Sequence, residues 1–256
     1  MYGIEDKLYK QLLILKNKYN IQGIKAEFEA EGSSFRDLIR LRRLTLKAGV
    51  DLYLKVGGVE AVRDIYDALE IGVDGIIAPM VESKFGAKKF YDSIERVYGS
   101  CGIHTTLNLE TVNAIDNIDE ILEYANNRFD NITIGRTDLS GSYFDTNINP
   151  NCEFIYNVLQ DIADKIQNTN LTLTIGGGVS SDTLNSLRLK YHNLASMIYK
   201  LETRKVAFLA HLFLDMDNAM TEVLKFEELY ILSKKEFSDL KIKTEIERLT
   251  ELSRRL

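Results

Sequence analysis

The sequence is poor in cysteine and in proline. Its 256 residues include only two cysteines, which are too few for a disulfide framework. The only two prolines, Pro79 and Pro150, follow strand-like or loop segments, so no proline-rich linker divides the chain. We therefore expect one domain over residues 1–256, with an N-terminal helix within 1–21 and a C-terminal helical extension over 202–256.

The sequence also lacks an excess of positive charge and any long apolar run. Its 32 basic and 38 acidic residues give a net charge of −6, which argues against a nucleic-acid partner. No apolar stretch approaches the roughly 20 residues of a transmembrane helix, and no N-terminal segment resembles a signal peptide. We expect a cytoplasmic protein without a membrane partner.

Strand-like runs alternate with segments of helical period along the first 200 residues. This rhythm is typical of parallel α/β proteins, and the length suits a TIM-type (β/α)8 barrel. Only seven runs are evident, so either one strand of the barrel is irregular or its run is not apparent in the sequence. The predicted strands cover residues 23–29, 51–56, 73–78, 103–110, 131–135, 171–176 and 194–201, after an opening helix at about 4–19.

The predicted strands separate apolar from polar side chains. In the first strand, Lys25, Glu27 and Glu29 alternate with apolar residues, and in the fourth strand Asn108 and Glu110 do the same. The helices outside a barrel pack against the apolar side chains of its strands, so the polar side chains point toward the lumen. An open sheet with one wet face is the alternative. A lumen rich in carboxylates would require cations for compensation.

Two carboxylates follow strand ends on the rim where barrel enzymes place their chemistry. Glu110 ends the fourth predicted strand, and Asp138 follows the fifth. Two acidic oxygen donors that meet there would bind a hard divalent cation such as Mg²⁺ or Mn²⁺. The alternative is that each carboxylate caps a following helix.

Further candidates follow the first two strands. Lys55 would neutralise an enolate or form a Schiff base with a carbonyl; the alternative is an ion pair in the lumen. Gly57 and Gly58, which follow it, are candidate substrate contacts. Glu29 and Glu31 are candidate general bases if burial raises their affinity for protons.

The late strands offer candidate anion contacts. Gly177, Gly178 and Ser180 follow a strand and precede a helix, where backbone donors and hydroxyls would bind a phosphate or carboxylate. A turn with a serine cap is the alternative. Arg204 follows the last predicted strand and would add a cationic contact, or else begin a solvated helix.

Three segments together resemble the HpcH/HpaI aldolase and citrate lyase family over about residues 22–150. They are residues 73–83, 108–111 and 135–140, in the same order and spacing. The resemblance implies a phosphoenolpyruvate- or pyruvate-binding barrel in which a divalent metal chelates a 2-oxo acid or enolate. It places Glu110 and Asp138 at the two metal-binding carboxylates, and Asn108, a candidate substrate contact, where aldolases commonly carry glutamine. It also implies assembly through C-terminal helices, so we expect a homo-oligomer.

The sequence departs from that family at two positions. The Glu-His pair of the aldolases corresponds here to Glu29-Ala30-Glu31, and the following arginine corresponds to Lys55. We therefore expect a metal-dependent carbon–carbon lyase or aldolase that acts on a small anionic 2-oxo acid or carboxylate, either plain, phosphorylated or joined to coenzyme A. The alternatives are a non-catalytic barrel that serves as a binding or assembly subunit and a Schiff-base aldolase that uses Lys55.

Overall fold

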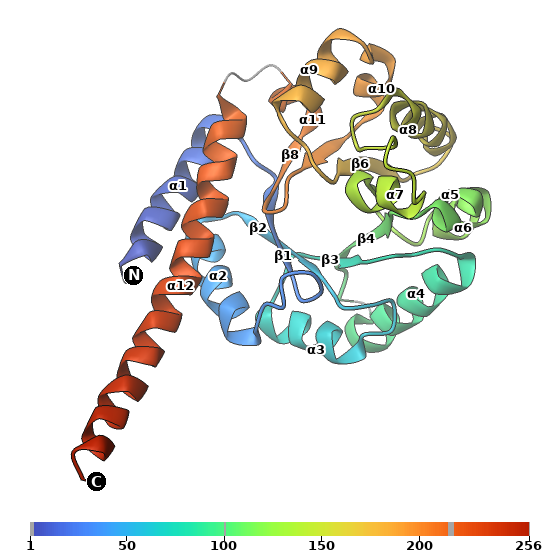
Figure 1. Ribbon diagram of the computed structural model, residues 1–256. Coiled ribbons are helices and arrows are strands. Elements are labelled where there is room, and N and C mark those ends of the chain that lie inside the picture. The colour runs from blue at the N-terminus through green and yellow to red at the C-terminus, as the bar shows by residue number, and fades with distance from the viewer. Residues whose placement is uncertain (1–2, 100, 215–217, 256) are drawn as a thin grey trace.

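The computed structural model describes residues 3–99, 101–214 and 218–255 and contains a closed barrel of eight strands (Figure 1). The strands are β1 (Gly23–Glu27), β2 (Asp51–Lys55), β3 (Gly75–Ala78), β4 (His104–Leu109), β5 (Asn131–Gly135), β6 (Thr172–Gly176), β7 (Lys200–Glu202) and β8 (Val206–Leu209). The helices are α1 (Ile4–Tyr19), α2 (Phe35–Ala48), α3 (Val62–Ile71), α4 (Lys84–Tyr98), α5 (Val112–Asp116), α6 (Ile118–Ala125), α7 (Arg136–Ser142), α8 (Glu153–Ile166), α9 (Ser181–Leu189), α10 (His192–Met197), α11 (Ala210–Phe213) and α12 (Ala219–Ser253). The predicted fold class is confirmed.

The eighth strand is the irregular one. Strands β1 to β7 pair in parallel, whereas β8 runs antiparallel to both β7 and β1. A three-residue turn joins β7 to β8, and the Thr203 N–H donates to the Val206 carbonyl at 2.9 Å. The barrel therefore closes through a hairpin, because no crossover helix separates its last two strands.

Two sequence predictions fail at this closure. Residues 194–197 belong to α10 rather than to the predicted strand 194–201, and β8 interrupts the region that we expected to be helical from residue 202 onward. The strand β8 reads Val-Ala-Phe-Leu and is largely buried, so it shows no alternation. A short apolar run of this kind cannot be distinguished from a helical segment by periodicity.

The division of polar and apolar faces is confirmed in the first strands. Ile24, Ala26 and Leu54 are fully buried in the apolar core, while Lys25 and Glu27 on the alternate positions are buried in polar surroundings. Helix α2 begins with a capping box in which Ser34 and Asp37 exchange hydrogen bonds, so the loop between β1 and α2 has a fixed end.

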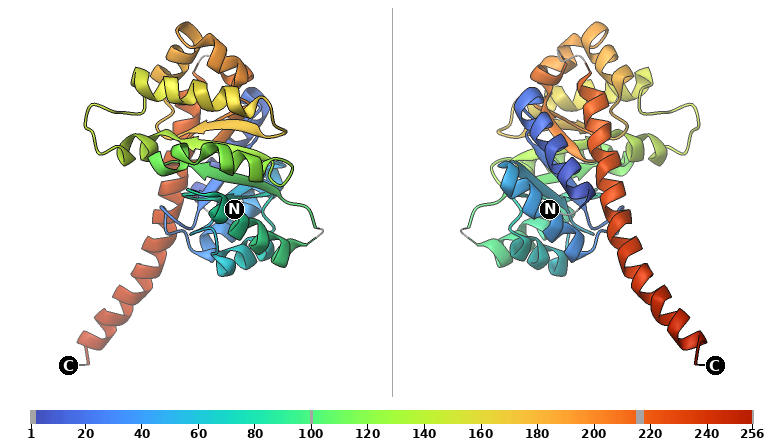
Figure 2. Two further views of the ribbon diagram at one scale, coloured as in Figure 1. Left: turned by 90° about the vertical axis from the view of Figure 1, so that its right-hand side faces the viewer. Right: turned by 90° about the vertical axis from the view of Figure 1, so that its left-hand side faces the viewer.

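The first and last helices pack side by side along one flank of the barrel (Figures 1 and 2). Helix α1 buries Leu8, Leu12 and Leu15, and α12 buries Val223 and Phe226. The C-terminal half of α12 extends past the barrel (Figure 2). None of the helices in the described part of the chain has the length and apolar character that a membrane span requires.

Candidate active site

A polar cavity of about 430 Å³ opens at the carboxyl ends of the strands. Its charged lining consists of three cations and five carboxylates, a net charge of −2. These residues are Lys25, Lys55, Arg204, Glu27, Glu29, Glu110, Asp138 and Glu202. Binding of an anion in such a cavity would need additional positive charge.

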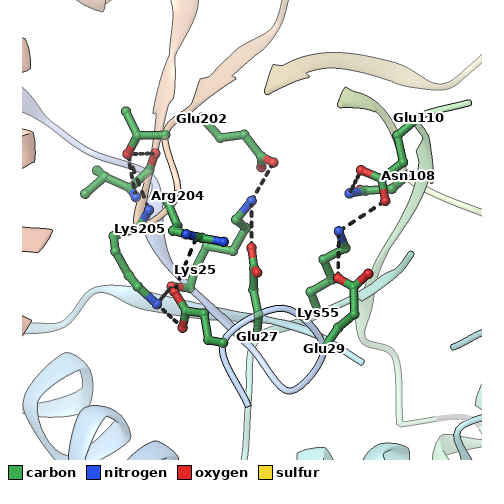
Figure 3. Close-up of polar contacts among 12 residues, drawn as sticks. Lys25, Glu27, Glu29, Lys55, Asn108, Glu110, Glu202, Arg204 and Lys205 are labelled. Carbon is green, nitrogen blue, oxygen red and sulfur yellow. Dashed lines mark hydrogen bonds and ion pairs between the residues drawn. The ribbon is translucent and has the colours of Figure 1, made fainter. Parts of the chain in front are cut away.

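Lys55 lies between two carboxylates at the end of β2 (Figure 3). Its Nζ is 2.9 Å from Glu29 Oε2 and 3.1 Å from Glu110 Oε1. Burial by itself lowers the pKa of Lys55, but the Glu110 and Glu29 carboxylates outweigh this effect and raise that pKa. Lys55 is therefore a fixed ammonium at neutral pH.

A second lysine forms a similar cluster elsewhere on the rim (Figure 3). Lys25 Nζ is 2.9 Å from Glu202 Oε1 and 3.4 Å from Glu27 Oε1. Although burial lowers the pKa of Lys25, the Glu202 and Glu27 carboxylates raise it overall. The sequence predicts polar lumen positions on β1. It does not predict that Glu202 faces them, because it does not predict the hairpin of β7 and β8.

The Glu110 carboxylate is held in a fixed position at the end of β4. Its Oε1 accepts the Met80 N–H at 3.2 Å, and its Oε2 accepts from Asn108 Nδ2 at 3.3 Å. A Cβ on Gly135 would lie 2.4 Å from Oε2, so a larger residue there would displace the carboxylate. Burial raises the pKa of Glu110, although Lys55 and the Met80 N–H act in the opposite direction.

Asp138 and Asn108 provide further oxygen donors. Asp138 is exposed in the first turn of α7 and lines the cavity, and its charge contributes to the raised pKa of Glu110. Asn108 is 3% exposed, yet its Oδ1 atom has no hydrogen-bond partner in the described part of the chain. A buried amide oxygen without a donor is costly, and a bound cation would satisfy it.

This donor set fits a magnesium or manganese ion. Two carboxylates and an amide oxygen are hard ligands, and the net lining charge of −2 matches a divalent cation. The described residues contain no cluster of three histidine, cysteine or acidic side chains suited to a metal. Mg²⁺ does not require one, because it usually binds one or two carboxylates and keeps several waters.

The structure brings some of the other predicted residues to the cavity and not others. Gly177, Gly178 and Arg204 line it, and Gly177 adopts a φ of +72° where a Cβ would lie 2.5 Å from the Arg136 and Thr137 nitrogens. The rest of the set lies outside the lining. Glu31 pairs with Lys205, the Gly57 N–H donates to Asp64, Gly58 does not line the cavity, and Ser180 caps α9.

Arg136 stabilises the cavity rim, a role that the sequence did not predict. It is fully buried and donates to the carbonyls of Gly176, Gly177 and Pro150 at 3.2, 2.9 and 3.0 Å. It also donates to Asn151 and Thr183. The Arg-Thr-Asp motif thus presents Asp138 to the cavity and turns Arg136 inward to fix the glycine loop.

The sequence profile of the HpcH/HpaI aldolase/citrate lyase family matches residues 41–170, about half of the chain. The chain belongs to this family. Comparison with curated proteins gives no match.

Solved structures of similar fold include family members at low identity. A HpcH/HpaI aldolase/citrate lyase family protein from Burkholderia cenocepacia J2315 is 13% identical over 70% of this chain and 79% of its own, with a TM-score of 0.58. The HpcH/HpaI aldolase from Desulfitobacterium hafniense DCB-2 is 15% identical over 76% and 82%, with a TM-score of 0.59. The citrate synthase SbnG is 16% identical over 90% of both chains, with a TM-score of 0.60. At these identities the likeness concerns the fold.

The part of the chain that matches the HpcH/HpaI family contains Lys55, Glu110 and Asp138. It excludes the loop after β1 and the hairpin of β7 and β8, which supply Glu29 and Arg204 to the same cavity. The cavity therefore combines residues from the matched segment with residues that lie outside it.

Proposed function

We propose that this protein is a divalent-metal-dependent carbon–carbon lyase or aldolase that acts on a small 2-oxo acid through an enolate. The supporting observation is the oxygen set at the ends of β4 and β5, formed by Glu110, Asp138 and the unpartnered Asn108 Oδ1. Bound Mg²⁺ or Mn²⁺ would supply Lewis-acid stabilisation of the enolate charge. Family membership supports the reaction class.

In this proposal, Lys55 stabilises developing negative charge without forming a covalent bond. Its ammonium lies on the cavity wall, 3.1 Å from Glu110, and its raised pKa keeps it protonated. A protonated lysine is no nucleophile, whereas its fixed charge contributes most where water is excluded. The geometry thus favours charge stabilisation over a Schiff base.

Glu29 is the proposed general base. Its carboxylate lines the cavity and its side chain is 26% exposed, so a substrate proton can reach it. Glu31 lies outside the cavity lining and its carboxylate is engaged by Lys205. Of the two candidates, Glu29 meets the requirement that a base lie within reach of the substrate.

Arg204, Gly177 and Gly178 are the proposed contacts for the substrate anion. Arg204 lines the cavity from the hairpin between β7 and β8, and its closest carboxylate contact is 3.9 Å, to Glu31. A guanidinium that is held loosely in this way is available to a substrate carboxylate or phosphate. Homo-oligomer formation and a cytoplasmic location remain predictions.

Calorimetric titration tests the proposal. The protein is titrated with Mn²⁺ and then with oxalate, an analogue of the enolate. We expect oxalate binding only in the presence of metal, and we expect Asp138→Asn and Glu110→Gln to abolish it. Glu153→Gln is the matched control, because Glu153 is an exposed surface residue that pairs with Lys190. Equal oxalate binding with and without metal would exclude the proposal.

One observation favours a non-catalytic barrel as the second candidate. Both Glu110 oxygens already have protein partners, with Lys55 and the Met80 N–H on Oε1 and Asn108 on Oε2. In that case Lys55 takes the place of the metal as an internal cation. The same titration distinguishes the two candidates, since a non-catalytic barrel would show no metal-linked oxalate binding.

A further inference from the structure

A buried ion pair lies behind the cavity rim, in the turn between β7 and β8. Lys205 is 1% exposed, and its ammonium pairs with the Glu31 carboxylate and lies 3.5 Å from the Lys25 carbonyl. The same ammonium lies 4.4 Å from the ring centroid of Tyr230, which is buried on α12. Three segments far apart in sequence, namely the loop after β1, the hairpin and α12, thus meet at one lysine.

A gain in folding stability does not explain why Lys205 is buried. Burying an ammonium is costly, and an apolar side chain of similar volume is often neutral or better at such a site. The Glu31 carboxylate and the Tyr230 ring compensate part of that cost. An ionic contact gives direction that an apolar contact lacks, so Lys205 fixes the orientation of the Glu31 carboxylate.

The loop that carries Glu31 also carries Glu29. The two residues are linked by a tight turn in which the Gly32 N–H donates to the Glu29 carbonyl at 3.3 Å and Gly32 has a φ of +52°. The loop begins where the Phe28 N–H donates to the Lys55 carbonyl at 2.9 Å. With Glu31 held by Lys205, the Glu29 carboxylate is placed 2.9 Å from Lys55 Nζ (Figure 3).

We propose that Lys205 is a positioning residue that acts through the Glu31 loop to hold Glu29 against Lys55. The inference rests on the proposed function, because it assigns the support of the proposed base. Lys205 itself does not line the cavity, whereas its neighbour Arg204 does. Packing of Tyr230 over Lys205 connects this support to α12.

The test measures the acylation rate of Lys55 by acetic anhydride, followed by peptide mass spectrometry. It needs no turnover, so it remains informative if the enzyme proposal fails. Glu29→Gln removes one of the two carboxylates that hold the Lys55 ammonium, so the side chain is freer to react. We expect labelling to become severalfold faster. Lys205→Met should produce the same increase.

The decisive comparison is the double variant. If Lys205 acts through Glu29, the double variant Glu29→Gln with Lys205→Met labels no faster than either single variant. Lys205→Arg should restore the wild-type rate, and Lys190→Met, at an exposed lysine, should leave it unchanged. If Lys205→Met is unfolded by circular dichroism, Tyr230→Leu takes its place in the cycle. An unchanged labelling rate in folded Lys205→Met overturns the proposal. A rate increase in the double variant that equals the product of the two single increases also overturns it.

Discussion

Lys55 and Glu110 form an ion pair at the centre of the candidate site, with 3.1 Å between Nζ and Oε1. Both residues are at least 95% buried. The pair unites the ends of β2 and β4, and it places the ammonium beside the carboxylate that we assign to metal binding. The two groups therefore determine each other's protonation.

Replacing Lys55 by methionine should make metal binding more sensitive to pH. Burial raises the pKa of Glu110 and Lys55 lowers it, so loss of the ammonium raises that pKa further. Protonated Glu110 cannot bind metal, so Mn²⁺ affinity in Lys55→Met should fall more steeply with falling pH than in the wild type. Calorimetry at a series of decreasing pH values measures this. Lys84→Met, at an exposed lysine, is the control, and parallel curves for wild type and Lys55→Met would contradict the assignment.

Borohydride should not trap pyruvate on Lys55 at about pH 7. The Glu110 and Glu29 carboxylates raise the pKa of Lys55, and a Schiff base requires the neutral amine. Mass spectrometry of peptides after incubation with pyruvate and borohydride gives the answer. A pyruvate adduct on the peptide that contains Lys55 would revive the Schiff-base aldolase.

Gly135→Ala should displace the Glu110 carboxylate. The new methyl group would lie 2.4 Å from Glu110 Oε2, and the backbone at Gly135 otherwise tolerates alanine because its φ is −85°. We expect Mn²⁺ affinity to fall by about tenfold to a hundredfold.

Gly141→Ala is the matched control for that substitution. Gly141 lies in α7 with open space around its Cβ position, so alanine there should leave metal affinity unchanged and stabilise the helix slightly. Equal metal affinity in both alanine variants would show that metal binding does not depend on the position of the Glu110 carboxylate.

Arg136→Met should destabilise the fold as well as the site. The substitution leaves the buried carbonyl of Gly176 and the partly buried carbonyls of Gly177 and Pro150 without their donor. We expect a loss of about 3 kcal/mol in the free energy of unfolding, since each unsatisfied group costs about 1–3 kcal/mol. The melting temperature should fall by roughly 6–12 °C.

Arg128→Met provides the comparison for the thermal melt. Arg128 is exposed and donates only to the Tyr124 carbonyl in the described structure, so its loss should change the melting temperature little. A melting temperature for Arg136→Met that equals the Arg128→Met value would show that Arg136 does not support the glycine loop.

The sequence predicted the parts of the fold that depend on local pattern. The opening helix agrees with α1 at both ends, and the predicted strand 131–135 agrees with β5. The polar alternation of β1 and β4 correctly placed Lys25 and Asn108 in the lumen. These features depend on side-chain period and on residues within one element.

The parts that escaped prediction depend on tertiary contacts. Glu202 faces Lys25 only because β7 and β8 form a hairpin, and Lys205 meets Glu31 across 174 residues of sequence. The inward turn of Arg136 likewise depends on carbonyls from β6 and from the loop before α8. No local sequence pattern can predict these contacts between residues far apart in the chain.

The central claim is a metal-assisted enolate at Glu110 and Asp138. Exchange of the pyruvate methyl protons with D₂O, followed by proton NMR, tests it without knowledge of the second substrate. We predict exchange that requires Mg²⁺ or Mn²⁺, falls on the order of 100-fold in Glu110→Gln, and persists in Glu153→Gln. Absence of exchange in the metal-loaded wild type, or undiminished exchange in Glu110→Gln, would contradict the account.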